Sequence, residues 1–421
     1  MDNKINSGNS NTENGQNSGA LAKESRFDRI LNTSLIAVFV LFIFGFAIWS
    51  VIQPDVEFSE QENRMLQQLP HMSSGSGSLT DKIKQKKFLD NLFDGSYASS
   101  MNKYLSDQFP MRNSLVGVKA ATEIALLKQE NDDVVLGRDE YIFVREDYPS
   151  KENLQKNIDS IAGFFERMNE SGRQTLFAPI GRNEDVETRH LPSGYSTEHS
   201  DDIWSCLDSL SSEKLGEYIN LRELLKDKAD SGESVYYRTD HHWTTLGAYY
   251  AYREIITALG ETPYDKDYFR VETASSSFYG TTWSSSGMKW ISPETIEFYR
   301  YDGDDNYITS AGTKTLDGFY DRSYLEKKDK YSAFLGGNTA LFTVKSKNGS
   351  EDRERLLLIK DSFSHSLAPF LALHYDLYIL DPRYSTVSIS DFVESNDIDK
   401  VLVTSCISTL TDAPVLSILD S

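Results

Sequence analysis

One long apolar run near the N-terminus stands apart from the rest of the hydrophobic pattern. Leu35–Ile52 contains no charged residue and is long enough to cross a bilayer as a helix. Basic residues precede the run and acidic residues follow it, which places the N-terminus in the cytoplasm and the remainder of the chain outside. The run is long for a signal peptide and lacks a small-residue cleavage site. An uncleaved transmembrane anchor over 34–52 is therefore favoured over a signal peptide or a buried core helix.

Polar segments flank this run on both sides. Residues 1–33 are rich in Asn, Ser and Gly, which predicts a disordered cytoplasmic tail. Residues 53–80 include the Ser/Gly-rich stretch 73–78 and predict a membrane-proximal linker. The folded extracellular domain is expected over 81–421.

Within that domain, helical and strand patterns alternate. Buried-strand patterns lie at Thr175–Ile180, Leu356–Ile359, Asp376–Leu380 and Lys400–Val403, with helical patterns between them. This alternation predicts an α/β fold with a doubly wound parallel sheet. Residues of about 264–331 are crowded with Tyr, Trp, Ser and Asp, and predict a β-rich insertion outside the central sheet. Its aromatic residues fit either a sugar-binding surface or ordinary packing.

Composition narrows the function classes. The net charge of −21, from 64 acidic and 43 basic residues, argues against a nucleic-acid surface, which needs clustered Lys and Arg. Two cysteines, Cys206 and Cys406, exclude a disulfide framework and leave open whether they pair.

The first candidate site segment is Ser234–Tyr252, where a short strand pattern meets a helical pattern. Polar residues Arg238, Asp240, His241 and His242 lie at the corner between them. Ligands bind at such corners in open α/β sheets. A carboxylate close to an imidazole is the pairing that a general base needs.

The second candidate segment follows the buried strand Leu356–Ile359. Asp361 is positioned as an N-cap that opens a helix running toward Leu373. Ser362 would then hold its hydroxyl at a strand end, beside helix N–H groups that stabilise an oxyanion. Ser362 is the candidate nucleophile, and the polar loop Gly181–Pro192 is expected to form a wall of the same crevice.

The tetrapeptide Asp240–Trp243 reads Asp-His-His-Trp, and the chain resembles the DHHW family of bacterial proteins. Further blocks typical of the family stand in order along the chain: Phe58–Glu60, Glu62–Arg64, Asp107–Pro110, Tyr236–Thr239, Leu246–Tyr250, Phe278–Thr281, Phe334–Asn338, Lys360–Ser362 and Asp381–Tyr384. This family is similar to the SGNH-hydrolase-like domain of alginate O-acetylation proteins. There the D-x-H-W block precedes the serine block, a permuted order relative to ordinary SGNH esterases.

The resemblance implies a triad. Ser362 would be the nucleophile, His242 the general base and Asp240 the carboxylate that orients it. The Ser362 hydroxyl should then lie roughly 2.6–3.2 Å from a His242 ring nitrogen, with Asp240 on the other nitrogen. If His241 faces Ser362 instead, it is the base.

Other residues are candidates for oxyanion or substrate contacts. Asn338, in Gly336-Gly337-Asn338, is the expected oxyanion amide. The remaining candidates for this group are Phe363, Arg238, His241 and Tyr279. Lys360 stands where SGNH enzymes carry the glycine of their Gly-Asp-Ser block.

The predicted function is an acyl-ester hydrolase or an O-acyl(acetyl)transferase that acts on a cell-surface or secreted polysaccharide. The resemblance implies no cofactor and no metal, and a possible membrane acyltransferase partner that supplies the acyl group. Two rival interpretations remain. One is a non-catalytic polysaccharide-binding or export-scaffold protein; the other is a metal-dependent phosphoesterase that uses the Asp-His-His cluster and needs further clusters elsewhere.

Overall fold

The computed structural model describes residues 26–59, 61–70, 95–131, 133–145, 149–215, 218–349 and 352–420. They form two compact units. One comprises the residues up to Val56 and from Gln68 to Pro110, and the other comprises Glu57–Gln67 and the residues from Met111 onward. Residues 1–25 of the predicted tail, 60 and 71–80 of the predicted linker, and 81–94 of the predicted domain lie outside the described residues.

The first unit contains the apolar helix α1 (Arg26–Ile52). Its segment Arg29–Ile52, 24 residues with a mean hydropathy of 2.8, is long and apolar enough to cross a membrane. The helix begins eight residues before the predicted anchor, so residues 26–33 are helical and not part of a disordered tail. The helix α3 (Ser96–Asp107) belongs to the same unit, and Phe46 stacks on Phe109 at 5.6 Å between ring centroids.

The second unit begins earlier than the boundary at residue 81 that the sequence predicts. Its N-terminal piece forms a small hairpin from β1 (Phe58–Ser59) and β2 (Arg64–Met65). Glu62 in the hairpin turn pairs with Arg64 at 2.7 Å and also with Arg112 of α4 (Arg112–Ala125). These ion pairs attach the segment to the unit that follows it in the sequence.

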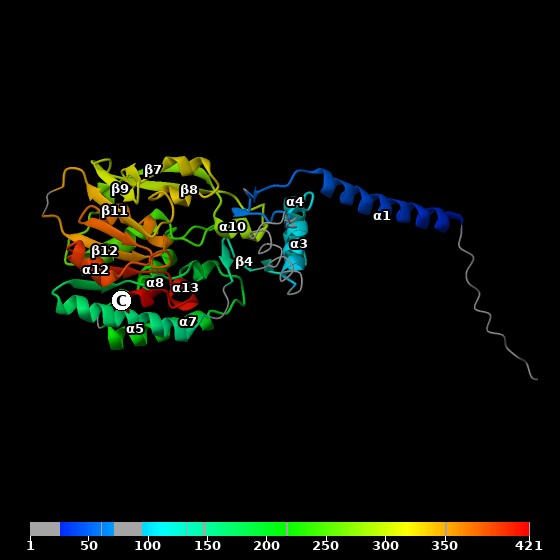
Figure 1. Ribbon diagram of the computed structural model, residues 1–421. Helices are drawn as coiled ribbons and strands as arrows, with labels where there is room; N and C mark the ends of the chain where they lie inside the picture. The colour runs from blue at the N-terminus through cyan, green and yellow to red at the C-terminus, as the bar shows by residue number, and fades with distance from the viewer. Residues whose placement is uncertain are drawn as a thin grey trace, which may run out of the picture. The chain divides into compact units, whose positions relative to one another are not determined.

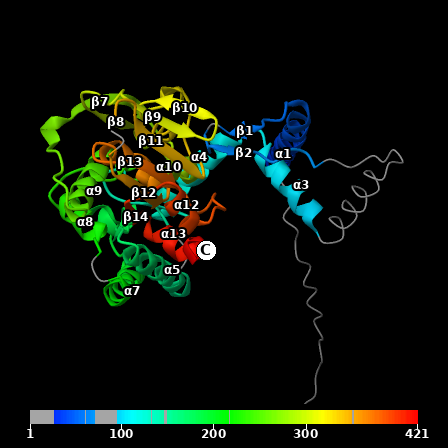
Figure 2. The same cartoon turned by 60° about the vertical axis from the view of Figure 1, so that its left-hand side comes forward.

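The centre of this unit is a seven-stranded sheet in the order β10-β9-β11-β13-β12-β14-β6 (Figures 1 and 2). Its strands are β6 (Gln174–Phe177), β9 (Tyr307–Ala311), β10 (Lys314–Asp317), β11 (Leu341–Ser346), β12 (Arg355–Lys360), β13 (Asp376–Leu380) and β14 (Lys400–Thr404). The four strands β13, β12, β14 and β6 are parallel, whereas β11, β9 and β10 are antiparallel. The prediction of a parallel sheet therefore holds for four strands and is wrong for the other three.

The predicted insertion is also only partly separate from the sheet. Strands β7 (Arg270–Phe278) and β8 (Glu294–Arg300) form their own two-stranded sheet, as expected. Strands β9 and β10, however, join the central sheet, which corrects the prediction for 307–317. Strand β9 pairs with β11 and so covers backbone groups that an open sheet edge would leave exposed.

The parallel strands are covered on both faces. Leu356, Leu357, Leu358 and Ile359 of β12 are all fully buried, as expected for a strand packed between two layers. Helix α5 (Lys151–Glu170) contacts α7 (Glu198–Lys214), α13 (Ile407–Asp412) and the C-terminal turn η6 (Val415–Asp420), while α9 (Thr245–Ala258) contacts α8 (Leu221–Asp230), α11 (Ala368–Leu371) and β8.

Shorter elements complete the unit. A three-stranded sheet forms where β4 (Val134–Leu136) pairs with β5 (Ile142–Val144) and also with β3 (Glu130–Asn131). The short helices are α6 (Asn183–Val186), α10 (Thr281–Ser286) and α12 (Ile389–Ser395). The 3-10 turns are η1 (Thr188–His190), η2 (Lys266–Tyr268), η3 (Arg322–Glu326), η4 (Tyr331–Ala333) and η5 (Ser362–His365). Cys206 and Cys406 are not joined by a disulfide.

Two local predictions near the site are wrong in detail. The expected strand at 234–237 is only an isolated bridge between Tyr236 and Trp243, because the chain turns back on itself and Thr244 N donates to Val235 O at 2.9 Å. The expected long helix after Ser362 is the turn η5 followed by the short α11. Pro369 has no N–H, so it cannot continue a helical hydrogen-bond ladder from η5 into α11.

Candidate active site

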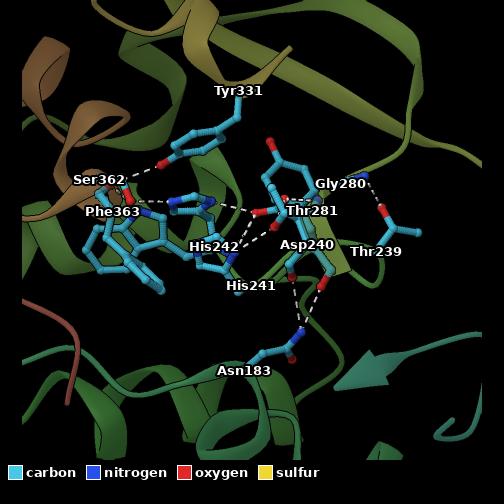
Figure 3. A network of polar contacts seen from close by, with 12 residues as sticks. Asn183, Thr239, Asp240, His241, His242, Gly280, Thr281, Tyr331, Ser362 and Phe363 are labelled. Carbon is cyan, nitrogen blue, oxygen red and sulfur yellow. Dashed lines mark hydrogen bonds and ion pairs between the residues drawn. The ribbon is translucent and has the colours of Figure 1, made fainter. Parts of the chain in front are cut away.

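Ser362, His242 and Asp240 form a hydrogen-bonded row (Figure 3). The Ser362 Oγ lies 2.8 Å from Nε2 of His242, and Nδ1 of the same ring lies 2.6 Å from Oδ1 of Asp240. The contact between Ser362 and His242 joins residues 120 positions apart in the chain. The predicted geometry is thus present, and the imidazole that faces the serine is His242 and not His241.

Asp361 fixes the position of the serine. Its Oδ1 accepts a hydrogen bond from the Phe363 N–H at 3.1 Å. Its Oδ2 accepts from the Cys406 N–H at 2.6 Å and from the Thr409 hydroxyl at 2.9 Å. Because Asp361 follows β12 and Cys406 follows β14, this carboxylate ties together the loops at the carboxyl ends of neighbouring strands.

The imidazole of His242 is held between two segments. Its ring stacks on Tyr331, with centroids 4.0 Å apart and an interplanar angle of 11°. The neighbouring indole, Trp243 Nε1, donates to the Phe363 carbonyl at 2.9 Å and contacts Ser366 Oγ at 3.0 Å. The fourth residue of the Asp-His-His-Trp motif therefore joins the histidine segment directly to the turn that carries the serine.

Asp240 is buried and fully hydrogen-bonded. Its Oδ1 also accepts from the His242 N–H at 3.0 Å, and its Oδ2 accepts from the Thr281 N–H at 2.7 Å and the Thr281 hydroxyl at 3.0 Å. Burial opposes ionisation, but the neighbouring His241 and His242 and these hydrogen bonds outweigh it and hold the pKa of Asp240 well below its usual range. A side chain at Gly280 would overlap the Asp240 carboxylate, so glycine is required there.

His241 has a different environment from its neighbour. Its Nδ1 lies 2.8 Å from the Thr281 hydroxyl, and its ring packs against His242 with centroids 3.9 Å apart. Its side chain is 42% exposed and faces a cavity. It is therefore placed for contact with a ligand and not with the serine.

A cavity of about 320 Å³ opens over the serine. Its walls come from loops that follow parallel strands, from β5, from α10 and from the segment that carries His241. The lining residues are Ile142, Val144, Arg182, Asn183, Glu184, His241, Thr282, Asp361, Ser362, Phe363, Arg383, Cys406, Ser408 and Thr409. The prediction that the loop Gly181–Pro192 forms a wall of the crevice is confirmed, since three of its residues line the cavity.

Three predicted site residues lie outside the lining. Asn338 is exposed just before β11, which is separated from β12 by β13 and so by about 10 Å of sheet. Tyr279 packs on Trp283, with ring centroids 4.4 Å apart. Arg238 pairs with Glu140 at 2.8 Å. Their assignment to the oxyanion or substrate contacts is therefore corrected, whereas Phe363 and His241 do line the cavity.

Several lining residues escaped the sequence reasoning. Asn183 donates from Nδ2 to the backbone carbonyls of Tyr237 and Asp240, at 3.0 and 3.4 Å, and so fixes the backbone of the segment that carries Asp240. Arg383 and Thr409 reach the cavity from the loops after β13 and β14. Their positions in the sequence could have identified them as lining residues. Each follows a predicted parallel strand, and parallel strands end at the same edge of the sheet.

The same motif also offers ligand atoms for a metal. One atom from each of Asp240, His241 and His242 lies within 4.8 Å of the others. Both ring nitrogens of His242 are already engaged, one by Asp240 and one by Ser362. A metal held by His242 would have to replace one of these two hydrogen bonds.

The chain is similar to one protein family and to several known proteins. Residues 203–380 match the family model described as DHHW protein. The probable alginate O-acetylase AlgJ of Pseudomonas putida is 24% identical over 172 residues, 40% of this chain and 44% of the relative. The corresponding protein of Pseudomonas aeruginosa is 25% identical over 162 residues, 37% of this chain and 41% of the relative. This chain thus spans less than half the length of the curated relatives.

Solved structures show a similar fold. A DHHW family protein from Eubacterium siraeum superposes with a TM-score of 0.55 at 21% identity, covering 68% of this chain and 94% of that chain. Bacillus cereus PatB1 with a sulfonyl adduct superposes with a TM-score of 0.56 at 17% identity, covering 67% and 98%. At these identities the similarity establishes the fold alone.

Proposed function

Residues 203–380 are a DHHW family region, and from that premise we propose that the chain is a membrane-anchored, SGNH-like O-acetyltransferase that acylates a polysaccharide through Ser362, His242 and Asp240. The observation that carries this proposal is the row of hydrogen bonds, 2.8 Å from serine to imidazole and 2.6 Å from imidazole to carboxylate. A nucleophile, a base and an orienting carboxylate in this order are the requirements for acyl transfer.

The proposed reaction has two halves. His242 Nε2 takes the proton from Ser362 Oγ while the oxygen attacks the carbonyl of an acyl donor. The tetrahedral intermediate collapses to an acyl-serine, and the imidazolium returns the proton to the leaving group. In the second half, His242 takes a proton from the acceptor hydroxyl as its oxygen attacks the acyl-serine. The imidazolium then returns this proton to Ser362 Oγ as the ester product leaves, which restores the free serine and the neutral imidazole. Asp240 stabilises the imidazolium in both halves.

Donors for the oxyanion are expected from the cavity wall. The backbone N–H of Ser362 makes no hydrogen bond to the residues that the structure describes, which leaves it available for an oxyanion. The amide of Asn183 lies in the same wall, but its Nδ2 already donates to the carbonyls of Tyr237 and Asp240. One such donor typically contributes about 10²–10³-fold to turnover.

The choice of acetyl transfer to a sugar rests on the curated relatives, which are named as probable alginate O-acetylases. Hydrolysis is the competing fate of the acyl-serine when water takes the place of the sugar hydroxyl. A purely non-catalytic glycan-binding role is less well supported, because binding alone does not need a serine hydroxyl aligned on an imidazole.

The placement of the domain follows from its anchor. The helix within Arg29–Ile52 would hold the N-terminus in the cytoplasm and the domain outside, with basic residues on the inner side. An acyl group exported by a multi-pass membrane acyltransferase would then reach the site close to the membrane.

The test uses the detergent-solubilised full chain with a chromogenic acetyl ester and, separately, an acetyl donor with a polysaccharide acceptor. We expect Ser362→Ala to lower turnover by at least about 10³-fold. Ser364→Ala is the matched control, because Ser364 lies in the same turn and its buried hydroxyl has no hydrogen-bond partner among the described residues. Equal activity of Ser362→Ala and wild type would refute the proposal.

A further inference from the structure

Helix α4 and its two ends leave an apolar face exposed. Five large apolar side chains there are between 44% and 90% exposed: Met111, Leu115, Val118, Leu126 and Leu127. The first four recur at helical spacing, so they lie along one side of the helix. The opposite side packs into the domain through Ala120, which is completely buried. Several exposed apolar side chains gathered on one face of a helix indicate a contact surface.

The loop at residues 287–291 packs along α4 and adds two side chains beside this face. Methylene carbons of Lys289 lie 3.3 to 3.7 Å from the position that a Cβ at Gly117 would take. The next residue, Trp290, is 45% exposed. A lysine whose stem lies on apolar surface and an indole with one polar end are side chains suited to a membrane–water interface.

The charge of this region differs from that of the whole chain. The chain has a net charge of −21. Residues 111–128 contain one acidic residue, Glu123, and three basic residues: Arg112, Lys119 and Lys128. The exposed face of α4 therefore lies in a locally basic part of an acidic protein. An apolar helix face flanked by basic residues is typical of helices that lie on a bilayer containing anionic lipid.

The connection to α1 brings a bilayer within reach of α4. Helix α1 ends at Ile52 and β1 begins at Phe58, so the chain between them can span at most about 20 Å. Glu62 of the same hairpin forms an ion pair with Arg112 at the start of α4. If α1 crosses the membrane as proposed above, α4 is confined to a region close to the lipid surface. A partner in solution has no such link.

The buried side of α4 supports the wall of the active-site cavity. Ala120 belongs to one apolar cluster with Ile142 of β5, and Trp283 of α10 packs against that cluster. Ile142 and Thr282, the neighbour of Trp283, both line the cavity over Ser362. Helix α4 lies beside α10 and β4 (Figure 1). A surface that holds α4 would therefore also fix the distance of the cavity from that surface.

We propose that the exposed face of α4 lies on the bilayer that holds α1, on lipid that includes anionic headgroups, and so keeps the cavity over Ser362 close to the membrane. This inference rests on the proposed membrane anchor and not on the acyl-transfer chemistry. It adds a second contact with the lipid, so that the domain is oriented on the membrane and does not turn freely about residues 53–57. An acyl group that emerges from the membrane would then meet the cavity in a fixed orientation.

The experiment measures the surroundings of Val118 in the full chain. Val118→Cys is made together with Cys206→Ser, which leaves the buried Cys406 as the remaining native thiol. The new thiol is labelled with bimane, and the chain is reconstituted into vesicles of phosphatidylcholine and phosphatidylglycerol. We expect emission at shorter wavelength and quenching by nitroxide-labelled lipid. A nitroxide near the headgroup should quench more than one near the acyl-chain end, because such helices sink only about 5–10 Å.

Two controls accompany this measurement. Val271→Cys places the label on an exposed valine of β7 in the same unit, and it should remain in water and unquenched. Vesicles of phosphatidylcholine alone should give weaker quenching at position 118, because the attraction between basic residues and anionic headgroups is absent.

A charged variant tests the apolar face itself. Leu115→Asp with Leu126→Asp, in the chain labelled at position 118, should abolish the quenching because two carboxylates would have to leave water. Turnover of a chromogenic acetyl ester in solution should stay unchanged, since neither residue lines the cavity. Ile308→Asp with Val387→Asp is the matched control, because both residues are exposed and lie outside α4; it should keep the quenching.

The contrary outcomes identify other occupants of the face. If the label at position 118 stays in water, or if position 271 is quenched equally, the inference is wrong. If the label is shielded from water but not quenched by lipid nitroxides, α4 faces another part of this chain or a second copy, and the inference is again wrong. A dependence on the protein-to-lipid ratio would then identify the second copy.

Failure of the anchor can be told apart from failure of this inference. Retention of the chain by the vesicles after an alkaline wash reports on the anchor. A chain that is neither retained nor quenched shows that both are wrong, whereas a retained chain without quenching at position 118 shows that only the inference is wrong. Ester turnover by the same labelled chains reports separately on the proposed chemistry.

Discussion

Two buried carboxylates in this domain each hold two basic groups, with opposite consequences. Asp240 faces the imidazoles of His241 and His242, whereas Asp381 faces the ammonium of Lys360 and the guanidinium of Arg383. In both cases burial opposes ionisation but the cationic neighbours prevail, so the pKa of each carboxyl lies below its ordinary value. The two sites differ in whether the partner can give up its proton near neutral pH.

An imidazole can, and a guanidinium cannot. Asp240 therefore suits a site where a proton moves to and from His242, and Asp381 suits one where a charge stays in place. The comparison teaches that a low carboxylate pKa does not by itself identify a catalytic acid or base. Whether the basic partners of the carboxylate can lose a proton near neutral pH decides whether the site suits proton transfer.

The largest expected effect separates these two roles. Asp240→Asn removes the charge that stabilises protonated His242 and should lower turnover of an acetyl ester by about 10³–10⁴-fold. Asp381→Asn leaves the buried Lys360 without its carboxylate partner and should lower the free energy of unfolding by about 3–5 kcal/mol. Ester turnover and thermal unfolding measured on both variants would show the contrast. If the two variants lost activity and stability in the same proportion, the distinction between Asp240 and Asp381 would be wrong.

A smaller effect is expected at Gly280. The methyl group of Gly280→Ala would overlap Cβ and Oδ2 of Asp240 and displace the carboxylate from His242. Turnover should fall about 10²-fold, since misplacement of a catalytic group by an ångström has that order of effect. Gly163→Ala in α5 is the control, because the added methyl would meet only an Arg167 nitrogen at 3.8 Å. Unchanged kinetics in Gly280→Ala would show that Asp240 tolerates displacement.

Glu187 is a third buried carboxylate, and it differs from Asp240 and Asp381 because its nearest basic groups lie beyond hydrogen-bonding distance. Glu187 is 3.8 Å from Arg189 Nε and 3.7 Å from His190 Nε2, and neither of its oxygens accepts a hydrogen bond of ordinary geometry from a described residue. Burial therefore raises the pKa of Glu187 from 4.5 to about 7. A raised pKa stabilises the fold while the carboxyl is protonated, and this stability is lost as the pH rises through about 7.

The measurement is the free energy of unfolding of wild type and Glu187→Gln between about pH 5 and about pH 8. The amide cannot ionise, so the variant should gain on wild type as the pH rises, by up to about 3 kcal/mol. A constant difference across this range would show that Glu187 ionises normally in the folded chain.

The last prediction is that a chelator has no effect on ester turnover. If Asp240 and His242 serve proton transfer, dialysis of the full chain against a chelator should leave ester turnover unchanged. Loss of activity that zinc restores would instead support a metal held by Asp240, His241 and His242, whose ligand atoms are close enough for one.

The contact between Ser362 and His242 was predicted through the resemblance to the DHHW family, because the family's Asp-His-His-Trp and serine blocks are each local in sequence. The residues that surround Ser362 and His242 were harder to predict from the sequence. Arg383 and Asn183 reach the cavity from the loops after β13 and β6, and only the strand order shows that these loops meet. Asn338 has a suggestive glycine context, but strand order places it beyond β13.

The predictions of two local elements were wrong for a related reason. The pattern after Ser362 predicts a helix, yet Pro369 interrupts the ladder and tertiary hydrogen bonds to Trp243 fix the chain as a short turn. The sequence pattern placed β9 and β10 in an insertion outside the central sheet. It could not show the pairing of β9 with β11, because the paired residues lie more than 30 positions apart. Non-local pairing overrode the local pattern in both cases.

The indole of Trp243 gives the site an unusual dependence on the order of events during synthesis. Its partners, Phe363 and Ser366, lie some 120 positions further along the chain, and the loop that holds Asp361 lies later still, at Cys406 and Thr409. A nascent chain therefore carries His242 long before the residues that hold Ser362 in place have been synthesised. The full set of hydrogen bonds around the serine can form only after the last strand, β14, has been added.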